Sequence, residues 1–394
     1  MIAAFAAGVL LLGIILQDAF EVMLLPRRVP RRIRLMRWFF RVSWAVWRAL
    51  SRWLPTQAKR EKFLGIYGPL SMVLLFALWA AGLIFGFGLI EWSVQQGSGP
   101  TPTIGEETYM SGVTFFTLGY GDVVPHTSAG RVVAVLEAGI GIGFIAVVIG
   151  YLPVLYQLFS RREAHVIQLD ARAGSPPTAT AMLCRHAESG GLSRLDEVLR
   201  TWEIWGADLL ESHLSYPMLA YYRSQHDDQS WLAALGAIMD TCALVLVGVE
   251  DIPPLQARMT FAMCRQVVLE MARSLGVNTR QGPEASRLNH EDYLNMLIRF
   301  VDAGVRWDGG AEAEETLGAV RATYEPFVMG LAEHLAIDVP GWVMEETTDH
   351  WERGPRGIIA RRLIEDLVEG AASPSSPAAR SRRSFARRLR DRLK

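Results

Sequence analysis

The residues most able to do chemistry form a hexapeptide between two long apolar stretches, Thr117-Leu118-Gly119-Tyr120-Gly121-Asp122. If its carbonyl groups lined one side of an extended chain, the oxygens of residues 117–120, with the Thr117 hydroxyl below them, would replace the hydration shell of K⁺. Carbonyls line up in this way only when alternate residues adopt dihedral angles that a β-carbon resists, which explains the glycines at positions 119 and 121. A plain glycine-rich turn is the alternative interpretation.

Three apolar runs, 2–25, 66–90 and 132–158, are long enough to cross a bilayer. The first run has no basic region at its start, carries Asp18 and Glu21, and lacks a small-residue cleavage site. We therefore expect an uncleaved membrane helix there rather than a signal peptide.

The basic residues predict how these runs are oriented. Segment 26–65 holds twelve Lys and Arg residues, segment 91–130 holds none, and Arg161 and Arg162 directly follow the third run. Because basic residues accumulate on the cytoplasmic side, we expect the 26–65 linker and the C-terminal half to be cytoplasmic. The N-terminus and the hexapeptide loop would then lie outside.

Residues 31–54 interleave arginines with tryptophans at three- and four-residue steps. This pattern predicts an amphipathic helix in the headgroup layer, with its basic face on anionic lipid. The spacing of Arg31, Arg34 and Arg37 also suggests a voltage-sensing helix. That alternative is disfavoured because a sensor needs a helical bundle to shield its charges, and only one membrane helix precedes this segment.

A short helix expected at 106–116 would direct its C-terminal, negative end at the ion path. The order of outer helix, short helix, TLGYGD and inner helix resembles the pore module of bacterial potassium channels, within the tetrameric cation-channel superfamily. The resemblance covers 66–162. It implies a homotetramer, K⁺ selectivity, and an inner helix that opens by bending at a glycine. We expect K⁺ as the permeant ion and no organic cofactor.

The resemblance places that hinge on Gly141. Further along the inner helix, residues on one helical face would line the cavity and the lower gate: Ile142, Ile145, Ile149 and Pro153. Pro153 removes a backbone hydrogen bond and is expected to kink the helix. The glycines around Gly141 mimic a dinucleotide-binding fingerprint, but they neither follow a strand nor open a helix.

Two carboxylates near the hexapeptide need partners. In one group of related channels a pore-helix glutamate pairs with the filter aspartate; that position is Val113 here, so Tyr109 is the candidate partner of Asp122. Glu137 lies within the inner helix, where carboxylates are costly and usually functional. It either tunes the field behind the filter or hydrogen-bonds the pore helix.

The C-terminal half is acidic and helical. Residues 163–370 contain 32 acidic and 17 basic residues, a net charge of −15, and strand signals are nearly absent. Apolar spacing predicts helices over 192–213, 216–226, 231–249, 255–275, 290–307 and 312–335. We interpret 231–249 as a buried core helix rather than a fourth span, because Asp240 lies at its centre.

Other features of this half identify no ligand. Cys184, Cys242 and Cys264 are scattered, as expected for reduced thiols. No nucleophile–base arrangement indicates an enzyme, no nucleic-acid partner is expected, and the cytoplasmic ligand is unknown. The basic end of the chain, 380–394, is typical of a contact with lipid or an acidic domain, or of a passive disordered tail.

We therefore predict an all-α membrane protein in the cell inner membrane, with five segments. They are a first membrane helix (1–25), a basic linker with an interfacial helix (26–65), a potassium-channel pore module (66–162), an acidic α-helical cytoplasmic domain (163–370) and a basic tail (371–394). The predicted function is a K⁺-selective channel gated by its inner helix and modulated by the cytoplasmic domain. The alternative is a membrane-anchored sensor or scaffold with a vestigial pore.

Overall fold

The computed structural model is helical, as predicted. It describes residues 1–23, 35–96, 102–188, 190–226, 228–277, 286–308, 312–344, 349–352, 356–357 and 359–364. Within these residues the only β-type pairing is an isolated antiparallel bridge between Val249 and Trp307. The predicted basic tail 371–394 and the start of the interfacial segment, 31–34, lie outside the described residues.

Three helices are long and apolar enough to cross a membrane: α1 (Ile2–Met23), α3 (Gln57–Val94) and α5 (Ser128–Ala173). Helices α3 and α5 contain the second and third predicted spans, and α1 covers the first as far as Met23, so the all-α membrane fold is confirmed. Both α3 and α5 extend beyond the apolar runs, because the flanking residues are also good helix formers. Helix α5 continues through Pro153 without ending there.

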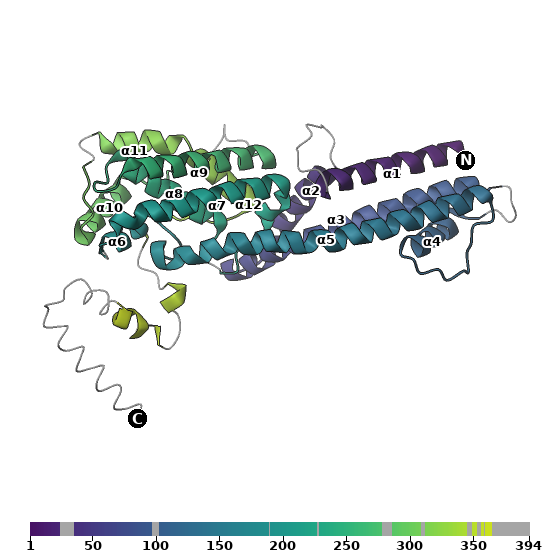
Figure 1. Cartoon of the computed structure of the whole chain (residues 1–394), viewed down its shortest axis with the longest axis horizontal. Coiled ribbons are helices and arrows are strands. Elements are labelled where there is room, and N and C mark those ends of the chain that lie inside the picture. The colour runs from purple at the N-terminus through teal and green to yellow at the C-terminus, as the bar shows by residue number, and fades with distance from the viewer. Residues whose placement is uncertain are drawn as a thin grey trace, which may run out of the picture. The chain divides into compact units, whose positions relative to one another are not determined.

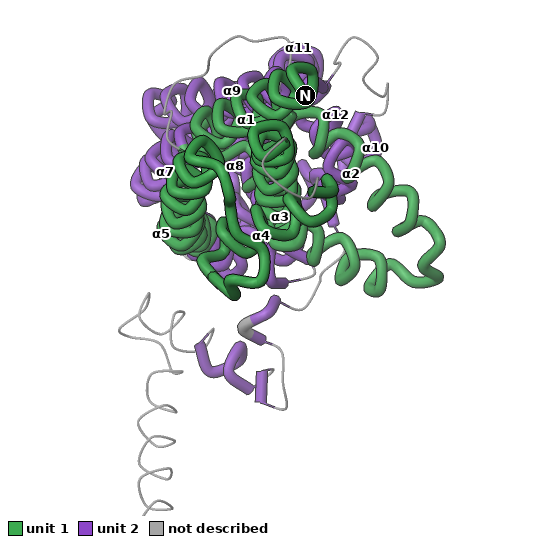
Figure 2. The backbone as a smooth tube through the Cα atoms, turned by 90° about the vertical axis from the view of Figure 1, so that its right-hand side faces the viewer, with its two compact units in different colours: residues 1–161, 212–223 green, residues 162–211, 224–394 purple. Residues whose placement is uncertain are grey.

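The chain divides into two compact units, coloured separately in Figure 2. The first unit contains Met1–Arg161 and the later segment Ser212–Arg223; the second contains Arg162–Glu211 and Ser224–Lys394. The predicted cytoplasmic domain, 163–370, is therefore interrupted. Ser212–Arg223 packs with the first unit because its aromatic side chains stack on rings there, notably Tyr221 on Phe40.

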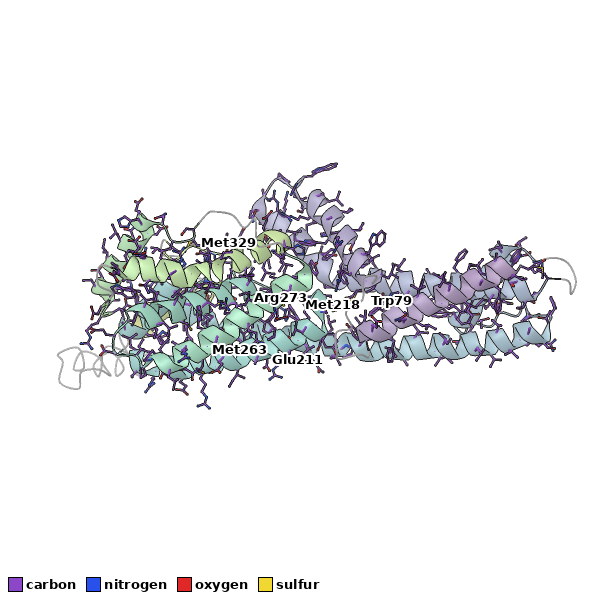
Figure 3. All side chains as sticks on the ribbon, turned by 90° about the horizontal axis from the view of Figure 1, so that it is seen from above. Trp79, Glu211, Met218, Met263, Arg273 and Met329 are labelled. Carbon is purple, nitrogen blue, oxygen red and sulfur yellow. The ribbon has the colours of Figure 1, made fainter. Side chains whose placement is uncertain are left out.

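In the first unit, α1 runs alongside α3 (Figure 1). Small residues permit a close approach: a Cβ atom built on Gly8 would lie 2.7 Å from the carbonyl oxygen of Gly86. Asp18 is buried in α1, and its carboxylate accepts hydrogen bonds from Trp79 Nε1 (3.1 Å) and from the Met36 amide (3.2 Å). Trp79, which is labelled in Figure 3, therefore links α3 to α1 through this hydrogen bond.

Helix α2 (Leu35–Ser51) packs one face on α3. Phe40 and Trp44 are buried on that face, and Trp44 lies 4.8 Å from the Tyr67 ring. Trp47 stacks on Phe63 at 4.3 Å and donates Nε1 to its carbonyl oxygen. The predicted amphipathic helix is thus present from residue 35.

The second unit is a helical domain. Its helices are α6 (Ala179–Glu188), η1 (Leu192–Arg194), α7 (Leu195–Ser215, whose last turn lies in the first unit), α8 (Trp231–Val247), α9 (Pro254–Leu275), α10 (His290–Ala303), α11 (Ala313–Ala322), α12 (Glu325–Leu335) and η4 (His350–Glu352).

Two helix predictions for this half are wrong and one helix was missed. Residues 312–335 form two helices, because the chain restarts at Glu325 with Pro326 in the first turn, where its missing N–H is tolerated. Residues 216–226 form only the 3₁₀ turn η2 (Pro217–Tyr221). Sequence reasoning missed α6, which is short and only weakly apolar.

Helix α8 is the core of the second unit rather than a membrane span. It is buried along nearly its whole length. Asp240 at its centre pairs with Arg287 through two contacts of 2.9 and 2.8 Å and accepts from the Tyr324 hydroxyl at 2.6 Å. A carboxylate satisfied in this way belongs in a protein core. The three cysteines are unpaired, and burial raises the pKa of both Cys184 and Cys264 to about 12.

Candidate functional site

Helix α4 (Ile104–Phe115) positions the hexapeptide. It begins with a capping box, in which the Thr103 hydroxyl accepts from the Glu106 amide and the Glu106 carboxylate accepts from the Thr103 amide. The Ser111 hydroxyl donates to the Ile84 carbonyl at 2.7 Å, which ties α4 to α3. The C-terminal end of α4, and so the negative end of its dipole, leads directly into Thr117.

The backbone of the hexapeptide alternates in handedness. Thr117, Gly119 and Gly121 have φ values of 57°, 60° and 76°, whereas Leu118 and Tyr120 do not have positive φ. This is the alternation expected if successive carbonyl groups line one side of the chain. The two glycines adopt these angles at little cost, but a β-branched residue such as Thr117 resists them.

Asp122 has the partner that the sequence suggested. The Tyr109 hydroxyl, on α4, donates to Asp122 Oδ2 at 2.9 Å. This hydrogen bond joins the pore-helix candidate to the far end of the hexapeptide, so it clamps both ends of the segment to one rigid element.

A cluster of acidic and amide groups lies around α4. Glu137 of α5 is fully buried, and one of its carboxyl oxygens lies within hydrogen-bond reach of the Ser111 hydroxyl, whose single proton is also directed at the Ile84 carbonyl. This contact with α4 fits one of the two roles considered for Glu137, a hydrogen bond to the short helix. Gln95 donates to Glu107 at 2.7 Å and accepts from the His126 amide at 2.9 Å. Sequence reasoning missed this second pair, whose only signal is a carboxylate in the first turn of α4.

The inner-helix glycines are not equivalent. A Cβ atom built on Gly141 would lie 2.2 Å from the carbonyl oxygen of Phe115, the last residue of α4. Cβ atoms on Gly139, Gly143 and Gly150 would meet nothing within 4 Å. Of these four glycines, Gly141 alone packs directly against the end of α4, a role that the hinge assignment did not include.

The predicted lower-pore residues lie along one side of α5, and most of them are exposed. Ile142, Ile149 and Pro153 are exposed, and Ile145 is half-buried. The most apolar stretch of α5 is only 11% buried, against 50% for that of α3. Tyr120 of the hexapeptide is likewise 67% exposed. The chain's own fold thus leaves the hexapeptide and one long apolar helix uncovered.

Residues 72–157 match a protein-family model described as an ion channel. The chain is also 23% identical, over 215 residues, to an uncharacterized membrane protein, YdjJ, of Bacillus subtilis (strain 168). That alignment covers 52% of this chain and 62% of the relative, which is less than two thirds of the relative's length. No solved structure matches. Residues 72–157 thus form an ion-channel domain within an all-α membrane protein.

Proposed function

We propose that this protein is a K⁺-selective channel, with 117–122 as its selectivity filter. The observation that carries the proposal is the alternating backbone of Thr117, Gly119 and Gly121 within TLGYGD. Carbonyl oxygens of residues 117–120, with the Thr117 hydroxyl, would take the place of the water around K⁺. The C-terminal end of α4 adds a negative partial charge that favours a cation nearby.

A homotetramer would complete this site. One chain supplies oxygens from a single side only, so a cage around an ion needs further copies about an axis. The open apolar side of α5 and the exposed Leu118 and Tyr120 support such an assembly, because apolar surface of this extent is expected to be covered by lipid or by protein.

Gating would belong to α5. The exposed face of Ile142, Ile149 and Pro153 would line the lower pore, where an apolar constriction stops ions by dewetting. Pro153 lacks the amide that would continue the helix ladder, so bending is easiest near it. The second unit would modulate this movement in response to a ligand or stimulus that its residues do not identify.

The proposed setting is the cell inner membrane, with the N-terminus outside and α2 on anionic lipid. Three sides of α2 differ in character: Phe40 and Trp44 pack on α3, arginines occupy a second side, and an exposed apolar stripe forms the third. That stripe consists of Trp38, Val42, Val46, Leu50 and the following Trp53. A basic side next to an apolar stripe suits a helix lying at the lipid headgroups.

Ion flux separates this proposal from a scaffold with a vestigial pore. The purified full-length protein, reconstituted in liposomes, should pass K⁺ and exclude Na⁺ under matched gradients. Protein-free liposomes and liposomes carrying the Gly119→Ala variant are the controls. Absence of K⁺ flux in a tetrameric, monodisperse preparation would favour the scaffold, and equal K⁺ and Na⁺ flux would refute selectivity.

A further inference from the structure

The segment Ser212–Arg223, here called the return segment, is an insertion in the first unit. The chain enters it from α7 and leaves it toward α8, and most of α7 and all of α8 belong to the second unit. Its central turn, η2, is buried: Met218, Leu219 and Ala220 are each 1% exposed. The return segment therefore packs within the first unit through a short, buried turn, while the chain on either side of it belongs to the second unit.

One side of the return segment packs against α2 and α3. The Tyr221 ring stacks on Phe40 of α2, with centroids 5.7 Å apart and planes 11° apart, and it lies 5.4 Å from Tyr67 of α3. Arg223 forms a 3.0 Å ion pair with Glu61, in which both side chains are largely shielded from water. These contacts fix the segment on the first part of α3.

The other side of the return segment packs against α5. The Tyr151 hydroxyl of α5 donates to the sulfur of Met218 at 3.6 Å, and the Tyr151 and Tyr216 rings are 5.4 Å apart. The Tyr222 ring lies 5.6 Å from Phe159. Met218 is labelled in Figure 3.

These contacts fall on both sides of Pro153, since Tyr151 precedes it and Phe159 follows it. A helix is weakest where proline removes a hydrogen bond and displaces the preceding turn. An element that contacts α5 on both sides of such a point is placed to constrain a bend there. The return segment meets that description, and it also rests on α3 as a support.

We propose that the return segment is the element through which the second unit sets the bend of α5 at Pro153 and hence the open fraction of the pore. The inference rests on the proposed channel function. A change in the second unit would move the ends of α7 and α8, and the return segment would carry that displacement to Tyr151 and Phe159. Coupling between distant parts requires an element with two arrangements that both parts bias, and the proposal assigns that role to the return segment.

Two separate variants of the full-length protein test this proposal, one at the contact with α3 and one at the connection to α8. Gly68→Ala pushes on the segment from α3, because a Cβ atom there would lie 2.7 Å from Cδ2 of Tyr222. Gly13→Ala, whose Cβ atom would meet nothing within 4 Å, is its matched control. An insertion of flexible Gly and Ser residues between Ser224 and Gln225 slackens the tether to α8, and the same insertion after Val277, in the α9–α10 connection, is the second control.

Open probability from single-channel recording is the readout. Gly68→Ala and the tether insertion should each shift it about fivefold or more, the lower end of typical coupling. The two controls should match the unmodified protein. The double variant should show no further shift, because both changes act on one element. If either change alone has no effect, or if their effects multiply, the proposal is overturned.

A milder pair guards against misfolding: Tyr151→Phe with Met218→Leu removes the hydroxyl–sulfur contact while keeping the volume nearly constant. It should also shift open probability, and a wild-type value would count against the proposal. Ion selectivity should be unchanged in every variant. If the unmodified protein showed no K⁺ selectivity, the proposed channel function would be refuted. Failure of that function is therefore distinguishable from failure of the return-segment proposal.

Discussion

A Cβ atom on Gly141 would lie 2.2 Å from the carbonyl oxygen of Phe115. A Cβ atom does not make non-bonded contacts this short in real structures, and the obstacle here is backbone rather than a flexible side chain. Gly141 is thus required for α5 to pass the end of α4, whatever its part in bending. We expect Gly141→Ala to push α5 away from the residues that precede Thr117 and so to impair conduction or tetramer assembly.

Gly143→Ala is the matched control for that change, because its Cβ atom would meet nothing within 4 Å. It should stiffen α5 by about 1 kcal/mol per subunit through helix propensity alone and lower open probability without changing conductance. Single-channel recording of both variants separates packing from bending. A Gly141→Ala channel with normal conductance and lower open probability would restore the plain hinge interpretation.

The filter glycines should tolerate no side chain. Gly119 and Gly121 have φ values of 60° and 76°, which alanine adopts only at a cost of about 1–2 kcal/mol per residue. We expect Gly119→Ala and Gly121→Ala to abolish K⁺ selectivity or conduction while leaving membrane insertion intact. Flux under bi-ionic K⁺/Na⁺ conditions measures this. Wild-type permeability ratios in both variants would refute the filter assignment.

The sequence predicted the unusual backbone conformation of Gly119 and Gly121, because the reason for it is local. An alternation of dihedral angles within six residues can be recognised without knowing the fold. The sequence did not predict Thr117 in the left-handed region, since a β-branched residue disfavours it and only the surrounding structure imposes it. The position of the return segment in the first unit could not be predicted from the sequence either. Its tyrosines are as typical of a domain core as of an anchor, and which unit buries them is decided by packing between distant parts of the chain.

The hydrogen bond from Tyr109 to Asp122 should stabilise the filter. Tyr109→Phe removes only the hydroxyl, so the ring packing is kept and one exposed, charge-assisted hydrogen bond is lost. We expect more frequent or faster closure of the filter during sustained recording, with unchanged selectivity at early times. Asp122→Asn should have an effect in the same direction, and a double variant no worse than the single ones would show that the two groups act as a pair.

The second unit should depend on the buried pair of Arg287 and Asp240. Arg287 also contacts Glu325 at 3.1 Å, so Arg287→Leu leaves two buried carboxylates without that cation. Breaking such a pair costs about 3–5 kcal/mol. Thermal unfolding of the detergent-solubilised protein should show a clear loss of stability. The matched control is Arg306→Leu, which breaks the exposed pair with Asp251 and should cost far less stability, because exposed ion pairs are screened by water. Equal losses in both variants would contradict the assignment of Arg287 to the core.

The basic side of α2 should bind anionic lipid. Arg41 and Arg52 are exposed beside the apolar stripe that begins at Trp38. Each arginine near an anionic surface contributes about 1 kcal/mol, so Arg41→Gln with Arg52→Gln should weaken anionic-lipid binding about 30-fold. The interaction should also weaken as salt rises, because surface charges are screened over about 8 Å at physiological ionic strength.

Arg200→Gln with Arg258→Gln removes two exposed arginines from α7 and α9 of the second unit and is the matched control. Anionic lipid titrated into the solubilised protein, followed by tryptophan fluorescence, gives the affinity, because Trp38 and Trp53 are 60% and 85% exposed and would report a lipid contact directly. A parallel measurement of K⁺ flux in anionic and neutral liposomes links affinity to function. If the α2 variant binds anionic lipid as tightly as the control, α2 is held at the membrane by its apolar stripe alone and its arginines serve another contact.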